Sequence, residues 1–292
     1  MLKASTPGGH WTIRLTWLVA FAALLTAAAL LLLGSDAALG LALTAAIVFV
    51  VALVAYLIRH QRFLSRLTRA EALVAADDLA AARSLVSPLM DRFPGIAAVQ
   101  RVAGLVLYAS GDPLSAASLL ERSRAVDATA IVALVASYAA LNKAGDARRA
   151  AERSPDHPDV RLALAWAELV ATGGDRERGA ELAHALGNGT PSRAAMAGTL
   201  RAIAAARRGD ADGMQDELRA AEARRTALSP SERAFIGYLG GIALRESGAL
   251  DDARATFTIA IETAPDTIGE ALARRERAHI PASSASVQPS SD

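Results

Sequence analysis

The stretch GDPLSAASLLE, residues 111–121, decides the fold because its opening Gly-Asp pair recurs along the chain. The pair appears again as Gly145-Asp146, Gly174-Asp175 and Gly209-Asp210. Glycine readily adopts the left-handed conformation that ends a helix, and aspartate caps the next helix by accepting its free amide hydrogens. Each pair therefore predicts a tight turn between two helices.

The positions equivalent to Asp112 repeat at a nearly constant spacing. They are Asp78, Asp112, Asp146, Asp175, Asp210 and Ala249, separated in turn by 34, 34, 29, 35 and 39 residues. Ala or Gly also occupies ten of the twelve positions that lie four residues after or eight residues before these points. A period near 34 with small residues at fixed places predicts an array of paired, closely packed helices. The fifth unit runs long before LSPSE, residues 228–232, where we expect the array to be disturbed.

The period, turn residues and small packing positions together resemble the tetratricopeptide repeat (TPR) family. The resemblance covers about Leu64–Pro265 and implies an all-α repeat domain over residues 61–278, a right-handed α-solenoid of about six helical pairs. It also implies a concave face, made by the first helix of each pair, where protein or peptide partners dock. Transferred unit by unit, this face consists of Arg101, Tyr108, Asn142, Lys143, Arg161, Glu168, Arg207, Tyr238 and Arg245. We expect Arg101 and Tyr238 to point away from the core between the helices.

Two apolar segments precede the repeats. Between Leu15 and Ile58 the only charged residue is Asp36, which separates a segment of 19 residues, 15–33, from one of 22 residues, 37–58. A helix of about 20 residues crosses the ~30 Å hydrocarbon layer of a bilayer. The sequence therefore predicts a transmembrane hairpin of two helices over residues 15–58.

Basic residues flank this hairpin on both sides. Lys3 and Arg14 precede it, the loop between the spans has no basic residue, and Arg59, Arg62, Arg66 and Arg69 follow it. Because cytoplasmic flanks carry the basic residues, both termini and the repeat domain are predicted on the cytoplasmic side of a bacterial inner membrane, with residues 1–14 as a short tail. A cleaved signal peptide is an alternative for the first segment, but the second span would still leave the bulk of the chain inside. The four arginines are also expected to contact anionic lipids.

The second span is expected to continue directly into the repeats. No Gly or Pro occurs between Leu41 and Ser87, and Ala, Leu and Arg fill most of the stretch up to Ala76. These residues favour a helix. We predict one unbroken helix over residues 41–76 that joins the membrane span to the first repeat.

Composition excludes several classes of function. The 31 basic and 30 acidic residues give a net charge of +1, so no overall field attracts nucleic acid. The chain has no cysteine, which removes disulfides, thiolate nucleophiles and cysteine-based metal sites. The short cluster Asp156–Asp159 is interpreted as a polar loop, so we expect no catalytic residue, metal or cofactor. The Pro/Ser-rich residues 279–292 are predicted to be a disordered tail.

These features favour a non-enzymatic, membrane-anchored scaffold that binds proteins or peptides. The alternative is a structural subunit of a larger membrane complex, assembled through the hairpin. The layout also resembles bacterial inner-membrane proteins associated with haem biosynthesis that place TPRs behind two spans.

Overall fold

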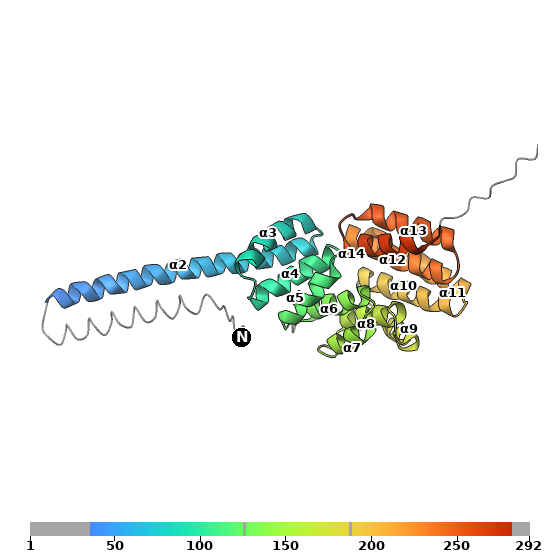
Figure 1. Ribbon diagram of the computed structural model, residues 1–292, viewed down its shortest axis with the longest axis horizontal. Coiled ribbons are helices and arrows are strands. Elements are labelled where there is room, and N and C mark those ends of the chain that lie inside the picture. The colour runs from blue at the N-terminus through green and yellow to red at the C-terminus, as the bar shows by residue number, and fades with distance from the viewer. Residues whose placement is uncertain (1–35, 125–126, 187–188, 282–292) are drawn as a thin grey trace, which may run out of the picture.

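The computed structural model describes residues 36–124, 127–186 and 189–281, and every regular element in these ranges is helical (Figure 1). The prediction of an all-α chain is thus confirmed for this part. The predicted tail 1–14, the first span 15–33 and residues 282–292 lie outside the described residues. The elements are α2 (Asp36–Ala75), α3 (Leu79–Arg92), α4 (Ala97–Ala109), α5 (Pro113–Arg122), α6 (Ala128–Ala140), α7 (Ala144–Ala151), α8 (Pro158–Val170), α9 (Arg176–Ala185), α10 (Pro191–Arg207), α11 (Ala211–Glu222), the 3-10 turn η1 (Arg225–Ala227), α12 (Pro230–Glu246), α13 (Leu250–Thr263) and α14 (Ile268–His279).

Helix α2 runs unbroken for 40 residues, which confirms the predicted continuous helix. Its first part projects away from the other helices, while its last part packs against α3 and α4 (Figure 1). Nine of the thirteen large hydrophobic residues that are exposed in the described chain lie between Ile47 and Ile58. A contiguous apolar surface of this kind is atypical of a soluble monomer. By length and composition, α2 is the one helix of the described chain that is suited to cross a membrane, within Ala46–Ala75.

Aspartate caps confirm three of the four turns predicted from the Gly-Asp pairs, and a further cap occurs at Asp78, which follows Asp77. A side-chain oxygen of the capping aspartate accepts a backbone N–H three residues later. This occurs at Asp78 (3.1 Å), Asp112 (3.0 Å), Asp175 (3.1 Å) and Asp210 (2.9 Å). Positive φ angles of 83°, 76° and 86° occur at Gly111, Gly209 and Gly248, so the helix before each of these turns ends as expected.

The third unit is an exception, and the prediction that Gly145-Asp146 forms its turn is wrong. Both residues lie inside α7, and the turn is closed earlier by Asn142 at a φ of 59°. Asparagine tolerates the left-handed region better than most residues, so the chain turns three residues before the glycine. Lys143 then precedes α7 without a side-chain cap.

Small residues allow the paired helices to approach closely. The helices pair in chain order from α2–α3 to α12–α13, each first helix also packs against the next first helix, and α14 follows the last pair. A Cβ atom added to Gly104 would lie 2.6 Å from Leu120 Cγ, and one added to Gly241 would lie 2.4 Å from Phe257 Cε1. Cβ atoms in proteins do not approach other carbon atoms this closely, so a larger residue at either crossing would force Leu120 or Phe257 to move.

The buried residues form two main cores that meet at α4. A smaller core joins α2, α3 and α4, and Val106 belongs to it. Leu105, the preceding residue, belongs to the larger core, which extends to α14. The last part of the long helix α2 therefore packs in its own core, distinct from that of the later helices.

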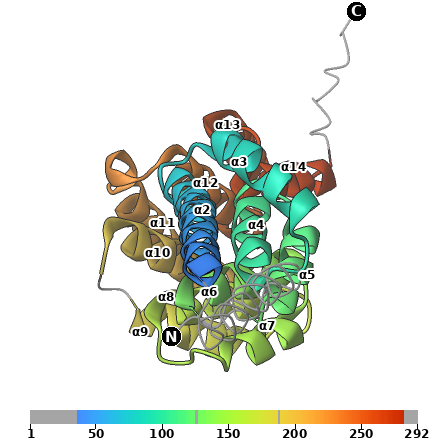
Figure 2. The same ribbon diagram turned by 90° about the vertical axis from the view of Figure 1, so that its left-hand side faces the viewer.

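Helices α12 and α14, near the end of the chain, contact the turns that follow α2 and α4. The backbone N–H of Ser231, at the start of α12, donates to Asp77 Oδ2 at 2.8 Å, in the turn after α2. Gly111, in the turn after α4, lies against α14, because an added Cβ would be 3.0 Å from Ala271 Cβ. Both views show α14 beside α4 (Figures 1 and 2). Backbone contacts of α12 and α14 with α4, α6 and α8 are few, so side chains make most of this interface.

The C-terminal end of the chain is ordered slightly further than predicted. His279 ends α14, and the side chain of Ile280 is buried. The guanidinium group of Arg254 donates to the backbone oxygens of Ile280 and Pro281. Residues 279–281, which belong to the predicted tail, are therefore part of the folded chain.

Candidate functional site

The residues predicted for the concave face divide between the two ends of the first helices. Arg101 and Arg161 lie in the first halves of α4 and α8. The other predicted residues, apart from Tyr238 in the middle of α12, lie in a last helical turn or just after it: Tyr108, Asn142, Lys143, Glu168, Arg207 and Arg245. The structure brings two of this second group, Arg207 and Arg245, together through Glu246.

Near the N-terminal ends of α4, α6, α8 and α10, ion pairs connect the first helix of one pair to the first helix of the next. Arg101 pairs with Glu71 of α2 and, at 3.5 Å, with Asp127, which caps α6. In the same way Arg193 of α10 pairs with Asp159 of α8 at 2.8 Å. Arg161, by contrast, has no ion pair with any described residue and is half-exposed. Arg101 thus bridges helices, whereas Arg161 makes no such bridge to a described residue.

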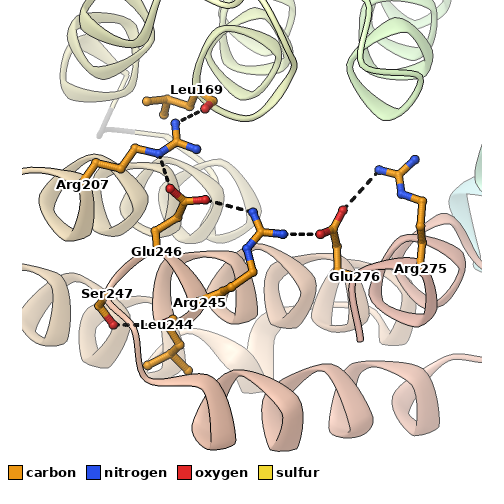
Figure 3. A network of polar contacts seen from close by, with 8 residues as sticks. All are labelled: Leu169, Arg207, Leu244, Arg245, Glu246, Ser247, Arg275 and Glu276. Atoms are coloured by element: carbon orange, nitrogen blue, oxygen red, sulfur yellow. Dashed lines mark hydrogen bonds and ion pairs between the residues drawn. The ribbon is translucent and has the colours of Figure 1, made fainter. Parts of the chain in front are cut away.

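At the C-terminal ends of α10 and α12, Arg207 and Arg245 belong to a row of alternating charges that we call the arginine–glutamate network (Figure 3). Glu246 lies between Arg207 Nε at 2.8 Å and Arg245 Nη2 at 2.9 Å. Glu276 pairs with Arg245 Nη1 on one side and with Arg275 Nη2, at 3.5 Å, on the other. Three cations thus alternate with two anions along α10, α12 and α14.

The outer arginines of this network also bind helix ends. Arg207 donates to the carbonyl of Leu169 in the last turn of α8 (Figure 3). Arg275 Nη1 donates to the carbonyl of Ala140, the last residue of α6, at 2.8 Å. The last carbonyls of a helix lack partners and carry partial negative charge, so guanidinium groups stabilise them. The network therefore ties α10, α12 and α14 to the ends of α6 and α8.

The network also fixes the charge of Glu246. Burial favours the neutral carboxyl and raises its pKa. Hydrogen bonds from Arg207 and Arg245 act in the opposite direction and outweigh burial, so the pKa of Glu246 falls to about 2. This carboxylate is therefore ionised at neutral pH, and its charge is already paired within the protein.

Tyr238 is part of the core, so the prediction that it points away from the core is wrong. Its side chain is fully buried, with ring centroids 6.3 Å from Trp166 and 6.4 Å from Phe257. Burial, with the nearby charge of Glu276, raises the pKa of Tyr238 far above its ordinary value. Tyr108 is half-buried, and burial and the neighbouring Tyr238 likewise raise its pKa. The position of Tyr238 in the sequence could not show this. Tyr238 lies on α12, and α12 and α14 pack against α8 and α6, which are distant in the sequence.

Glu168 is likewise buried and does not belong to an accessible face. Its carboxylate accepts hydrogen bonds from Arg148 Nη2 at 2.6 Å and from the backbone N–H of Asp175 at 2.7 Å. It ties α7 to α8 and to the turn that follows. Arg148 was not among the predicted residues, because its partner Glu168 lies 20 residues away and the repeat has no arginine at the equivalent positions of the other units.

Three of the predicted concave-face residues remain accessible without an ion pair to a described residue. Asn142 and Lys143 are exposed in the turn after α6, and Arg161 is half-exposed on α8. The predicted lipid-facing arginines are all exposed as well: Arg59, Arg62, Arg66 and Arg69.

The cluster Asp156–Asp159 has a structural role. His157 Nδ1 accepts the backbone N–H of Asp159 at 3.3 Å and so caps α8, while the Asp159 carboxylate pairs with Arg193. Among the described residues, no three metal-ligating side chains come together.

The described residues thus define an all-helical protein with one helix that is long and apolar enough to cross a membrane. Comparison with known proteins adds no family, because no family model, no curated protein and no solved structure matches the chain.

Proposed function

We propose that this protein is a non-enzymatic scaffold, anchored in a bacterial inner membrane, whose TPR-like helices bind protein or peptide partners at the cytoplasmic face. The observation that carries the proposal is α2, a single helix that contains the apolar exposed segment and ends in the first helical pair. A helix shared in this way holds the array rigidly against the bilayer. Six helical pairs with repeated caps, followed by α14, support a TPR-like right-handed α-solenoid.

The accessible part of the partner face consists of Asn142, Lys143 and Arg161. Two of these side chains are basic and make no ion pair with a described residue, which favours a partner with acidic side chains. Tyr238 and Glu168 are excluded from this face because both are buried.

The four arginines of α2 form a basic stripe, Arg59–Arg69, that suits an anionic lipid surface. Their spacings of three, four and three residues place them within an arc of about 80° on one side of a helix that turns 100° per residue. None of the four forms an ion pair with a described residue, and all are exposed. Each basic residue near an anionic bilayer contributes about 1 kcal/mol, so the stripe would draw this side of α2 toward the membrane.

The topology is tested by labelling single cysteines in this cysteine-free chain. Ser35→Cys should react with an impermeant maleimide on intact cells, and Ser283→Cys should react only after lysis. The reverse pattern would remove the cytoplasmic scaffold from consideration.

Partner binding is tested by photo-crosslinking from defined positions. A photoreactive residue at position 143 or 161 should capture the same protein in membranes. A photoreactive residue at exposed position 208, outside the proposed face, serves as the control. If position 208 captures the same protein as strongly as the other two, the assignment of the partner face is wrong.

The lipid stripe is tested by native mass spectrometry of the full chain with phosphatidylglycerol. Replacing the four stripe arginines with Gln should reduce retained phosphatidylglycerol, and phosphatidylcholine retention should be unchanged. The matched control replaces four exposed arginines elsewhere with Gln: Arg83, Arg124, Arg176 and Arg208. Equal losses in both variants would contradict a dedicated lipid surface.

A further inference from the structure

We infer that the turn between α3 and α4, residues 91–95, rests on the bilayer and that its Arg92 binds the phosphate group of an anionic lipid. The inference rests on the proposed insertion of α2 in the membrane and is independent of any protein partner. It adds a second lipid contact, on a different segment of the chain, to the basic stripe of α2.

The apolar surface of α2 has a clear end. Nine exposed large hydrophobic side chains lie between Ile47 and Ile58, and Arg59 follows directly. Charged side chains are costly within the hydrocarbon layer, so a membrane-crossing helix leaves this layer where such charges begin. The edge of the hydrocarbon layer therefore lies near Ile58.

The turn between α3 and α4 lies just beyond this edge. In Figure 1, α3 and α4 lie beside the last part of α2, and the ring centroids of Phe93 in the turn and Phe63 in α2 are 5.6 Å apart. Phe63 follows Ile58 by five residues, which is about 7.5 Å along a helix. The headgroup layer is about 5–7 Å thick on each side of the hydrocarbon core. The turn is therefore level with the outer edge of the headgroups.

Hydrogen bonds hold this turn in a fixed shape. The side-chain amide of Gln100, which is buried, donates to the carbonyl of Pro94 at 2.7 Å. The backbone N–H of Phe93 donates to the carbonyl of Leu89 at 2.8 Å, and that of Ile96 donates to the carbonyl of Phe93 at 3.2 Å. A turn that is already fixed loses little conformational entropy when it binds a surface.

Arg92 supplies the positive charge of the turn. Its side chain is exposed, forms no ion pair with a described residue, and lies over the ring of Phe93 at 5.4 Å. A guanidinium in contact with a ring keeps N–H donors for a phosphate, which arginine binds through two parallel hydrogen bonds. Asp91 is the one acidic side chain of the turn, and the four stripe arginines outnumber it. Attraction to an anionic surface extends over a Debye length of about 8–10 Å, so Arg92 lies within its range.

A second lipid contact away from the axis of α2 would orient the whole array. A membrane-spanning helix alone leaves the orientation open, because such helices tilt by about 0–40°. Phe63 and the four stripe arginines lie within an arc of about 120° around α2, at 100° per residue. One direction of tilt therefore brings both the stripe and the α3–α4 turn toward the lipid. Figure 2, a view along α2 from its first end, shows α3 and α4 to one side of this axis.

The position of the turn is tested with lipids that carry a nitroxide on the headgroup. In the cysteine-free full chain, Ala97→Cys places a fluorophore beside the turn, and Leu114→Cys places one beyond the far end of α4. Both positions are exposed, and the 13 residues of α4 separate them by about 20 Å. In nanodiscs of phosphatidylglycerol and phosphatidylcholine, the label at position 97 should be quenched at least about twice as strongly as that at position 114, because of this separation. Equal quenching would overturn the inference.

Lipid binding by Arg92 is tested with two variants of the same helix. Arg92→Gln should weaken the binding of phosphatidylglycerol to the full chain about fivefold, measured by lipid titration and native mass spectrometry. Arg83→Gln is the matched control and should bind as the parent does. Arg83 is also exposed without an ion pair to a described residue, and it lies nine residues, about 13 Å, farther from the bilayer along α3.

An unchanged affinity of Arg92→Gln, or an equal loss in Arg83→Gln, would overturn the inference. If Arg92→Gln loses helicity, Asp91→Asn decides instead, because removal of the opposing carboxylate should strengthen phosphatidylglycerol binding. No gain in that variant would then overturn the inference. Labelling of Ser35→Cys and Ser283→Cys tests the insertion of α2 by itself, so failure of this inference is distinguishable from failure of the proposed function.

Discussion

The carboxylate of Asp77 accepts the backbone N–H of Ser231 at 2.8 Å, although the two residues are 154 positions apart. Asp77 lies in the turn that ends the membrane-length helix α2, and Ser231 lies in the first turn of α12. The contact places a carboxylate at the positive end of a helix dipole, where it is stabilising. The helix proposed to enter the membrane is therefore connected directly to the C-terminal helices.

Gly104 should tolerate no side chain. Gly104→Ala places a Cβ 2.6 Å from Leu120 Cγ in a fully buried contact, and Gly104→Leu is worse, so we expect losses in unfolding free energy of about 1–3 kcal/mol. Gly240→Ala is the control, because its nearest neighbour would be 3.7 Å away. That change should stabilise α12 by about 0.5–1 kcal/mol, since alanine favours a helix over glycine. Chemical denaturation followed by circular dichroism measures both, and equal effects would contradict the close crossing.

Removing Arg148 should destabilise the protein through the carboxylate that it leaves behind. Arg148→Ala leaves the fully buried Glu168 without its charge partner, and we expect a loss of about 3 kcal/mol. Arg149→Ala removes an exposed pair with Asp146 on the same helix and should cost less than about 0.5 kcal/mol. The double change Arg148→Met/Glu168→Leu should recover most of the loss. If it does not, the charge of Glu168 is not the cause.

Two tyrosine-to-phenylalanine changes should differ in their effect on stability. The Tyr238 hydroxyl is buried near Trp166 and makes no hydrogen bond of normal length to a described residue, so Tyr238→Phe should be neutral or stabilise by up to about 1 kcal/mol. The Tyr138 hydroxyl donates to Glu121 at 3.1 Å, and Tyr138→Phe should cost about 1 kcal/mol. Thermal melts of the two variants check the prediction. A lower melting temperature for Tyr238→Phe would show that its hydroxyl has a partner, such as ordered water.

Acid should weaken the arginine–glutamate network over a defined range. The pKa of Glu246 is about 2 in the folded protein against an ordinary value of 4.5, so its contribution is complete above pH 4.5 and disappears as the pH falls toward 2. That contribution is at most about 3 kcal/mol. Glu246→Gln should lower stability at neutral pH and flatten the fall between these pH values. A parallel pH profile for the variant would contradict the role of this carboxylate.

The sequence determined the local structure of most units. Asp112 and Gly111 are sufficient to end one helix and begin the next, because capping and left-handed φ depend only on neighbouring residues. The absence of Gly and Pro likewise predicted α2 as one helix. The exception, Asn142, follows the same local chemistry with a different residue, which a search for Gly-Asp does not detect.

Only the tertiary structure decided which side chains are accessible. The repeat pattern placed Tyr238 and Glu168 on an open face, but α12 and α14 return to the early helices and bury what lies between. Arg275 binds the carbonyl of Ala140 from 135 residues away, and Arg148 reaches Glu168 from the neighbouring pair. Local signals fix helices and turns because their energies arise within a few residues of the chain. Burial and ion pairing depend on which distant segments meet, and this is set by the accumulated angles of a dozen helix contacts that no single motif encodes.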